Sequence, residues 1–303
     1  MIGRRVVPSL VARGHKVTAL GRSPEKRSAL EKQGAAAVDV DLLDPRTLRR
    51  ALGGHDVVIN LATHMPSTAT RMLFRWSWRE NDRIRREGSA ALVNAALAAG
   101  VGRFIQESFA LVYEDAGDRW IDEHWPLQPA AYNRTVLDAE RSAERFAAAG
   151  GAGVVLRFSV FYGADSHALH EMVDVMRKGW SPLPGDRDAF VSSISHDDAA
   201  TAVVAALDAP GGSYNVTDSD PLPRGEWIDL LADALSIPRP KPLPGILTRL
   251  GGSTMKLLTR SLRVSNAKLR GATPWTPRWP SVREGWRAIA PQLRKRRGEP
   301  NTP

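Results

Sequence analysis

The stretch from residue 103 to residue 140 constrains the fold most, because its pattern is that of a strand, a loop and a helix. Residues 103–106 form a short buried strand, after which the chain becomes polar around Ser108. An acidic, turn-rich loop then leads to Tyr132 and a helical segment that reaches Glu140. Open α/β sheets bind their ligands beyond the carboxyl ends of the strands. We therefore expect the hydroxyls of Ser108 and Tyr132 at that edge; the alternative is that Ser108 caps a turn and Tyr132 packs on a helix.

The rest of the chain repeats this alternation of strands and helices. An amphipathic helix is expected over residues 1–14. Further strands are expected at 15–22, at 36–45 with a turn at its end, at 55–63 and at 153–158. With 303 residues the chain can form one large domain, or a large one and a small one. The alternation predicts an α/β fold with a doubly wound parallel sheet, helices on both faces, and a smaller lobe built mainly after Tyr162.

These segments resemble the short-chain dehydrogenase/reductase superfamily, in its extended branch of NAD(P)-dependent epimerases and dehydratases. That branch has a Ser or Thr at a strand end, then a Val-Tyr pair, and Tyr-x-x-x-Lys after a loop. Residues 112–113 and Tyr132 match, whereas Val136 stands at the Lys position. The Ser/Thr position falls on Phe109, one residue after Ser108. The resemblance implies a Rossmann-like fold and carries over Tyr132 and Ser108 as catalytic candidates, in a degenerate motif.

The resemblance also implies a chemistry. In the family the Tyr acts as acid or base toward a substrate hydroxyl or carbonyl beside the nicotinamide. Its phenol, with an ordinary pKa of about 10, is tuned by the positive charge of the Lys. With Val136 there, Tyr132 loses that charge, and Arg134 points elsewhere because positions two apart do not share a helix face. We expect an NAD(P)-dependent oxidoreductase or epimerase with altered activity on a small substrate, nucleotide-linked or isoprenoid-like among the options; the alternative is a non-catalytic dinucleotide sensor.

The beginning of the sequence departs from the family pattern. Gly3 matches the last glycine of a Gly-x-x-Gly-x-x-Gly turn, but the sequence does not contain the strand and the two glycines that precede it. Those glycines let the backbone approach a pyrophosphate at the helix amino terminus. Either the start is assigned too late, which we favour, or the phosphate cradle is lost. Because the missing strand would be central, we expect either that the sheet closes over the gap or that two strand edges stay unpaired. We expect residues 1–303 to be poorly soluble or to bind NADPH feebly, and an upstream extension of the chain to restore binding.

The remaining cofactor contacts come from strand ends. Arg22 follows the second expected strand, where a guanidinium suits a 2′-phosphate, so NADP is preferred to NAD; the alternative is an ordinary surface Arg. Asp41 and Leu42 resemble the family's adenine contact. Leu61 and Ala62 belong to an Asn-Leu-Ala segment that lies along the nicotinamide in the family. The resemblance thus implies cofactor contacts at Gly3, Arg22, Asp41, Leu42, Leu61, Ala62 and Tyr132.

The domain organisation follows from the same comparison. Residues 1–163 are expected to form the NAD(P)-binding domain, with segments near 190–208 returning to it. Residues 164–290 would form mainly the substrate-binding lobe, with residues 213–216 as one of its edge strands, and 291–303 a basic tail. His196 with the two following carboxylates could be a metal site, but adjacent positions on a turn diverge, so helix capping is preferred and no metal is expected.

Charge and composition limit the other function classes. The net charge of +9 is concentrated in residues 241–303, which contain fourteen Lys or Arg and two Glu. Residues 71–86 also interleave aromatic residues with arginines, a pattern that can bind nucleic acid. A solvated basic tail and an apolar helix face are the preferred interpretations, so nucleic acid is not expected as a partner. No apolar run reaches the roughly 20 residues of a membrane span, and there is no cysteine. We expect a cytoplasmic protein with a small-molecule substrate; a homodimer is left open.

Overall fold

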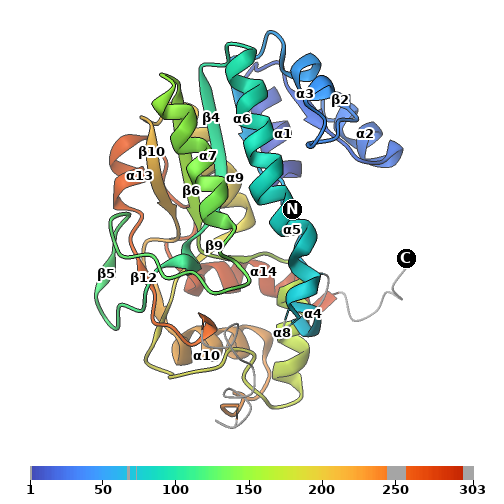
Figure 1. The fold of residues 1–303 in the computed structure, drawn as a ribbon. Coiled ribbons are helices and arrows are strands. Elements are labelled where there is room, and N and C mark those ends of the chain that lie inside the picture. The colour runs from blue at the N-terminus through green and yellow to red at the C-terminus, as the bar shows by residue number, and fades with distance from the viewer. Residues whose placement is uncertain (1, 67–68, 73, 244–256, 296–303) are drawn as a thin grey trace.

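A four-stranded parallel sheet lies at the centre of the computed structural model, which describes residues 2–66, 69–72, 74–243 and 257–295. The strand order is β10-β6-β4-β3 (Figure 1). The strands are β3 (Val57–Asn60), β4 (Arg103–Phe109), β6 (Ala152–Phe158) and β10 (Gly212–Val216). Ile105 of β4 lies in register between Ile59 of β3 and Val154 of β6. The predicted α/β fold with a parallel sheet is confirmed.

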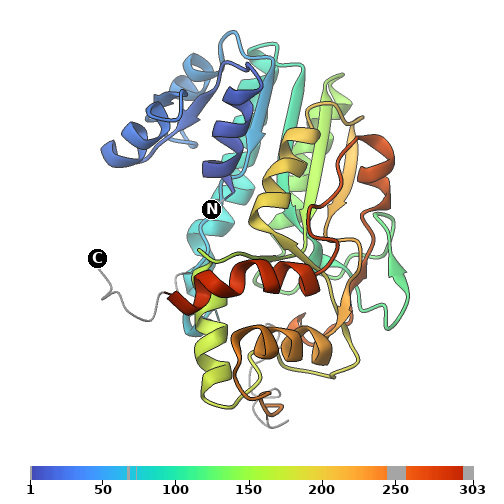
Figure 2. The same ribbon diagram turned by 180° about the vertical axis from the view of Figure 1, so that it is seen from behind.

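Helices cover both faces of this sheet. On one face lie α6 (Ser89–Ala98) and α7 (Val136–Ala148), and on the other α1 (Gly3–Ala12) and α9 (His196–Ala205) (Figures 1 and 2). Phe104 stacks on Phe146 of α7, with ring centroids 5.6 Å apart. At residue 153 a Cβ atom would lie 2.2 Å from a backbone oxygen of α7, so glycine is needed for helix and sheet to approach so closely. The apolar residues of alternate positions in β4 and β6 thus form two separate core layers.

The first two strands form a separate sheet. Strands β1 (Thr18–Leu20) and β2 (Ala36–Val38) pair in parallel. Each is followed in the chain by a helix, β1 by α2 (Pro24–Glu31) and β2 by α3 (Pro45–Leu52). Within the described residues, β1 does not pair with β3. A 2.8 Å hydrogen bond between the His55 ring and the Thr18 hydroxyl links the two sheets at one end. Of the two outcomes expected for the gap, the structure has the one with two unpaired edges.

These edges have a measurable consequence. In a parallel strand alternate amides point to either side, so part of β3 carries amides that face the gap without a strand partner. We expect these amides to exchange with solvent at least about 100-fold faster than the amides of β6, which has partners on both sides. Hydrogen–deuterium exchange followed by NMR would measure this. Equal protection of β3 and β6 would show that something covers the outer edge of β3.

A second, smaller part lies below the sheet. Helices α8 (His167–Arg177), α10 (Arg224–Leu235) and α14 (Val282–Lys295) enclose a core in which the rings of Trp227 and Trp286 are perpendicular, 4.8 Å apart (Figure 2). Short strands and one helix connect it to the rest: β5 (Trp120–Ile121), β7 (Val160–Tyr162), β8 (Phe190–Val191), β9 (Ser193–Ser195), β11 (Leu222–Pro223), β12 (Arg263–Val264) and α13 (Ala267–Ala272). No helix of the described residues is long and apolar enough to cross a membrane.

Two expectations about local structure are corrected. Residues 213–216 are not an edge strand of the lobe, because they belong to β10 and pair in parallel with β6 of the main sheet. The helix expected from Tyr132 begins only at Val136. The amides of Asn133 and Val136 bond the carbonyls three residues earlier, so the chain forms successive turns there before the helix starts. Tyr132 therefore stands in a turn that precedes α7.

The start of α1 is anchored to the segment that begins α9. The Arg5 guanidinium donates two hydrogen bonds of 3.1 Å to the Asp165 carboxylate. The same carboxylate lies 2.9 Å from Nδ1 of His196, whose side chain is only 1% exposed. Burial, and then the nearby charge of Arg5, lowers the pKa of His196 from 6.5 to about 4. His196 is therefore neutral at pH 7.

A neutral, buried His196 predicts acid sensitivity. The pKa of His196 is about 4 in the folded protein and about 6.5 in the unfolded chain. The contribution of the neutral imidazole to the unfolding free energy is therefore fully present above pH 6.5 and is lost as the pH falls toward 4. Between these limits the unfolding free energy of the wild type should fall by up to about 3 kcal/mol more than that of His196→Gln. Urea denaturation at a series of pH values would measure both. A constant difference between the two proteins would mean that the imidazole is not the titrating group.

Candidate functional site

The carboxyl end of β3 is fixed by a buried amide network. The side-chain nitrogen of Asn60 donates to Oε1 of Gln106 at 2.9 Å and to the Ser89 hydroxyl at 3.2 Å. Its side-chain oxygen accepts the backbone N–H of Ala62 at 3.2 Å. These bonds join β3, β4 and α6, and they set the course of the chain through Leu61 and Ala62, two of the predicted cofactor contacts.

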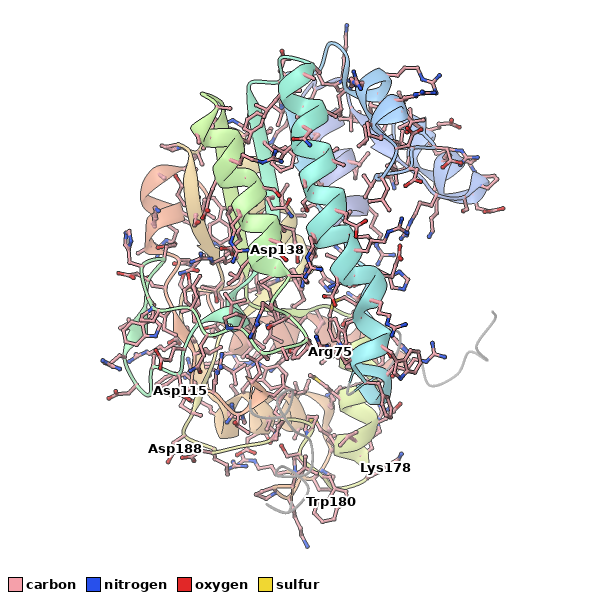
Figure 3. The ribbon with its side chains drawn as sticks, in the orientation of Figure 1. Arg75, Asp115, Asp138, Lys178, Trp180 and Asp188 are labelled. Carbon is pink, nitrogen blue, oxygen red and sulfur yellow. The ribbon has the colours of Figure 1, made fainter. Side chains whose placement is uncertain are left out.

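A π-helical turn brings a buried cation to the same edge. Helix α5 (Arg79–Arg83) continues into the π-turn η2 (Ile84–Gly88) and then into α6. Arg75, labelled in Figure 3, begins the 3-10 turn η1 (Arg75–Trp78) that directly precedes α5. Arg85, 4% exposed, lies in that turn and its Nη2 is 3.2 Å from Oε1 of Glu107. Within the described part of the chain, Nε of Arg85 and Oε2 of Glu107 have no hydrogen-bond partner. Such turns inside helices are frequent at functional sites.

Tyr132 packs beside this pair. Its ring lies 4.7 Å from the ring of Trp78, and the Thr135 hydroxyl donates to Asp82 at 2.7 Å, which holds the turn against α5. Burial raises the pKa of Tyr132 to about 12, opposed by the charges of Arg85 and Arg260. The phenol is therefore protonated at neutral pH. No group of the described residues hydrogen-bonds its hydroxyl, while Val136, at the position of the family's Lys, is fully buried.

Ser108 lies in a different environment. It is fully buried, and its hydroxyl donates to the carboxylate of Glu140. Glu140 in turn accepts two hydrogen bonds from Arg157, of 2.9 and 2.7 Å. The structure thus places Ser108 and Tyr132 on adjacent elements but gives the Ser108 hydroxyl a structural partner. The catalytic role of Ser108 stays a prediction.

An apolar hollow lies next to Tyr132. Its lining comprises Ala110, Leu111, Ser159, Val160, Leu183, Phe190, Val191, Ser192, Arg224, Leu257, Leu258, Arg260, Leu262 and Val264. Several of these apolar residues form one cluster, and Tyr132 packs against it. We call this space the lobe hollow.

The sequence analysis did not find the lobe hollow, Arg85 or Glu107. The hollow is assembled from segments separated by up to about 150 residues, so no local pattern reveals it. Glu107 had a usable signal, because it stands beside Ser108 near the end of a predicted strand. Arg85 had a weaker one, as one arginine among six in residues 71–86.

The predicted cofactor contacts lie along the other strand ends. Helix α1 begins at Gly3 and has neither an acidic residue in its first turn nor a side-chain cap, so no side chain of its own first turn caps its first N–H groups. Arg22 is exposed just after β1. The Asp41 carboxylate accepts the N–H of Leu43 at 2.9 Å, and Leu42 packs on Gly88 of the π-turn. The residues present fit a dinucleotide, and the individual contacts remain predictions.

The buried pair of Arg85 and Glu107 can be tested by stability. Glu107→Gln leaves the Arg85 charge without its counter-charge, so we expect the unfolding free energy to fall by about 3 kcal/mol. Adding Arg85→Gln should recover part of that loss. Glu87→Gln, in the exposed pair with Arg83, should change stability by about 0.5 kcal/mol or less. Urea denaturation of the wild type, these three variants and Arg85→Gln alone would measure this, and additive effects of the two single substitutions would contradict a coupled pair.

Comparisons with known proteins show the family and the fold. A family model described as NAD(P)H-binding matches residues 1–210. A 3-diazoavenalumate denitrifying reductase from a Streptomyces species is 32% identical over 302 residues, 94% of this chain and 95% of that protein. A 4-hydroxy-2-methyl-3-oxo-4-farnesyl-3,4-dihydroquinoline-1-oxide ketoreductase from Stigmatella aurantiaca is 29% identical over 78% of this chain and 71% of its own length. A human epimerase family protein, solved with NADPH, superposes with a TM-score of 0.76 at 21% identity, over 96% of both chains.

Proposed function

Because the chain belongs to the NAD(P)H-binding family and is an NAD(P)-dependent oxidoreductase-like protein, we propose that it is a reductase of a small carbonyl compound. The observation that carries this proposal is Tyr132, a protonated phenol beside an apolar hollow with two cations nearby. A protonated phenol suits reduction, which consumes a proton, better than oxidation, which needs a base. The two relatives described above, both named as reductases, support the same direction.

The bound dinucleotide would supply a hydride to the carbonyl carbon. Tyr132 would donate its proton to the carbonyl oxygen, so that the C=O double bond becomes a CH–OH group. The phenolate left on Tyr132 would be stabilised by the guanidinium groups of Arg85 and Arg260, whose charges act on this side chain. These two cations would take the place of the Lys that Val136 replaces.

For the cofactor we prefer NADP. The amino terminus of α1 at Gly3 would hold the pyrophosphate, and Arg22 would face the 2′-phosphate. Asp41 and Leu42 would contact the adenine, while Leu61 and Ala62 would lie along the nicotinamide. Calorimetric titration with NADPH and NADH would test the preference, which Arg22→Ser should abolish. A cytoplasmic location and a small-molecule substrate complete the proposal.

Replacing the phenol tests the proposed acid. Tyr132→Phe should lower kcat for carbonyl reduction by about 100-fold or more and change KM little, because the proton is donated only as the reaction proceeds. Tyr214→Phe is the matched control, since its hydroxyl bonds the carbonyl of Pro210 away from the hollow. NADPH oxidation followed at 340 nm with a panel of ketones and aldehydes would measure both. NADPH binding with no turnover of any carbonyl would favour the sensor alternative.

The raised pKa of Tyr132 predicts opposite pH profiles for the two directions. Reduction uses the protonated phenol, so its rate should stay constant from pH 7 to 10. Oxidation of the product alcohol needs the phenolate, which at pH 8 is about one molecule in ten thousand when the pKa is about 12. The oxidation rate should therefore rise about tenfold for each pH unit over this range. An oxidation rate that levels off near pH 8 would show that another group is the base.

A further inference from the structure

Arg224 is a buried cation without an acidic partner. Its side chain is 1% exposed and lines the lobe hollow. Its terminal nitrogens donate to three backbone carbonyls, those of Asp186 at 2.6 Å, Arg260 at 3.0 Å and Leu258 at 3.1 Å. Within the described residues no carboxylate forms an ion pair with it, and its Nε has no hydrogen-bond partner. Burying a charge on neutral acceptors alone is costly, so an anion bound beside Arg224 would be stabilised.

The acidic groups near Arg224 are engaged elsewhere. Asp115, on the loop that Figure 3 shows at the edge of the lobe, acts on the pKa of Arg224 only at a distance. Its two carboxylate oxygens accept the backbone N–H groups of Gly117 and Ser261, each at 3.0 Å. The Asp186 carboxylate accepts the N–H of Asp188 at 3.1 Å. Residues 244–256 contain no Asp or Glu in their sequence.

Two further groups of the lobe hollow favour an anion. Ser159 is 1% exposed, and within the described part of the chain its hydroxyl has no partner. Arg260 donates to the carbonyls of Tyr113 and Gln128, at 2.8 and 2.7 Å, and forms no ion pair with a described residue. Burial lowers the pKa of Arg260, as it does that of Arg224. The hollow therefore offers positive charge and free donors within an apolar lining.

We propose that the lobe hollow binds the carboxylate of an apolar organic acid, with Arg224 and Ser159 as the contacts of that carboxylate. This inference rests on the proposed function, because it names the class of substrate that would present its carbonyl to Tyr132. The unpartnered Nε of Arg224 and the hydroxyl of Ser159 supply two donors, as many as a carboxylate has oxygens. The aliphatic and aromatic lining suits a hydrocarbon or aryl body, whereas a phosphate or a sugar would leave most of its acceptors unpaired.

A matched pair of ligands tests the charge. We would titrate the protein, without cofactor, with 4-phenylbutanoate and with 4-phenylbutanamide, which has nearly the same shape but no charge. At pH 7 the acid should bind about 10-fold or more tightly than the amide, because a hydrogen bond to a charged group contributes about 1.5–3 kcal/mol. Isothermal titration calorimetry would measure both affinities. Equal affinities would overturn the proposal.

Variants locate the binding. Arg224→Gln should remove the preference for the acid. Ser159→Ala should weaken the binding of the acid about 5-fold or more and leave the affinity for the amide unchanged. Arg239→Gln is the control, because Arg239 is exposed and pairs with Asp233 outside the hollow. Since Arg224 also holds three carbonyls, its variant counts only if circular dichroism shows an unchanged fold. Ser159→Ala leaves the packing intact, so it tests the site on its own.

The outcomes separate the two proposals. Charge-selective binding that Ser159→Ala reduces supports the carboxylate site, whether or not the protein then reduces any ketone. Reduction of neutral ketones, with no preference for acids and no effect of Ser159→Ala, would overturn the carboxylate site and leave the proposed reductase in place. A preference for the acid that persists in both variants would also overturn the assignment, because the anion would then bind elsewhere.

Discussion

The ion pair between Glu140 and Arg157 is the interaction on which the arrangement of the sheet edge depends. Both side chains are nearly inaccessible and meet through two hydrogen bonds, so neither charge has water as an alternative partner. Around the pair, Ser108 donates to Glu140, and Arg157 donates to the Tyr113 hydroxyl, which donates to Asn215. Breaking one member of such a pair costs about 3–5 kcal/mol. The network therefore fixes β4, β6, β10 and α7 relative to one another.

This pair also explains why the site needs a cation from elsewhere. Glu140 stands one helical turn after Val136, so the inner face of α7 presents an apolar side chain and a neutralised carboxylate to the sheet edge. Any charge that acts on Tyr132 must come from another element. The structure supplies it from the π-turn at Arg85 and from Arg260 in the lobe. In the proposed reaction, these two arginines from segments distant along the chain would compensate for the missing Lys.

The alternation of strands and helices in the sequence predicted those features of the fold that depend only on residues close together in the chain. The strand at β4 and the parallel sheet both follow from local spacing and are confirmed. The position of Arg85 depends on a π-turn, which shifts a helix face by one residue and leaves no trace in the hydrophobic period. Residues 213–216 were assigned to the wrong sheet because the sequence of a five-residue strand does not indicate which other strand it pairs with. No sequence pattern indicates that Arg224 is buried, because the three carbonyls that its side chain bonds come from two segments distant along the chain.

The cofactor end and the lobe share one anchoring residue. Val6 and Leu10 pack α1 into the core beside α9, and no described strand stands between β1 and β3 to position α1 from the sheet. Arg5 then fixes the first turn of α1 to Asp165, which follows β7 and also contacts His196 at the start of α9. The chain that leads from β7 into the substrate lobe therefore determines where the amino terminus of α1 points. Arg5 also bonds Asp197 of α9, so the amino terminus of α1, where the pyrophosphate of the proposed cofactor would lie, is tied both to the segment after β7 and to α9.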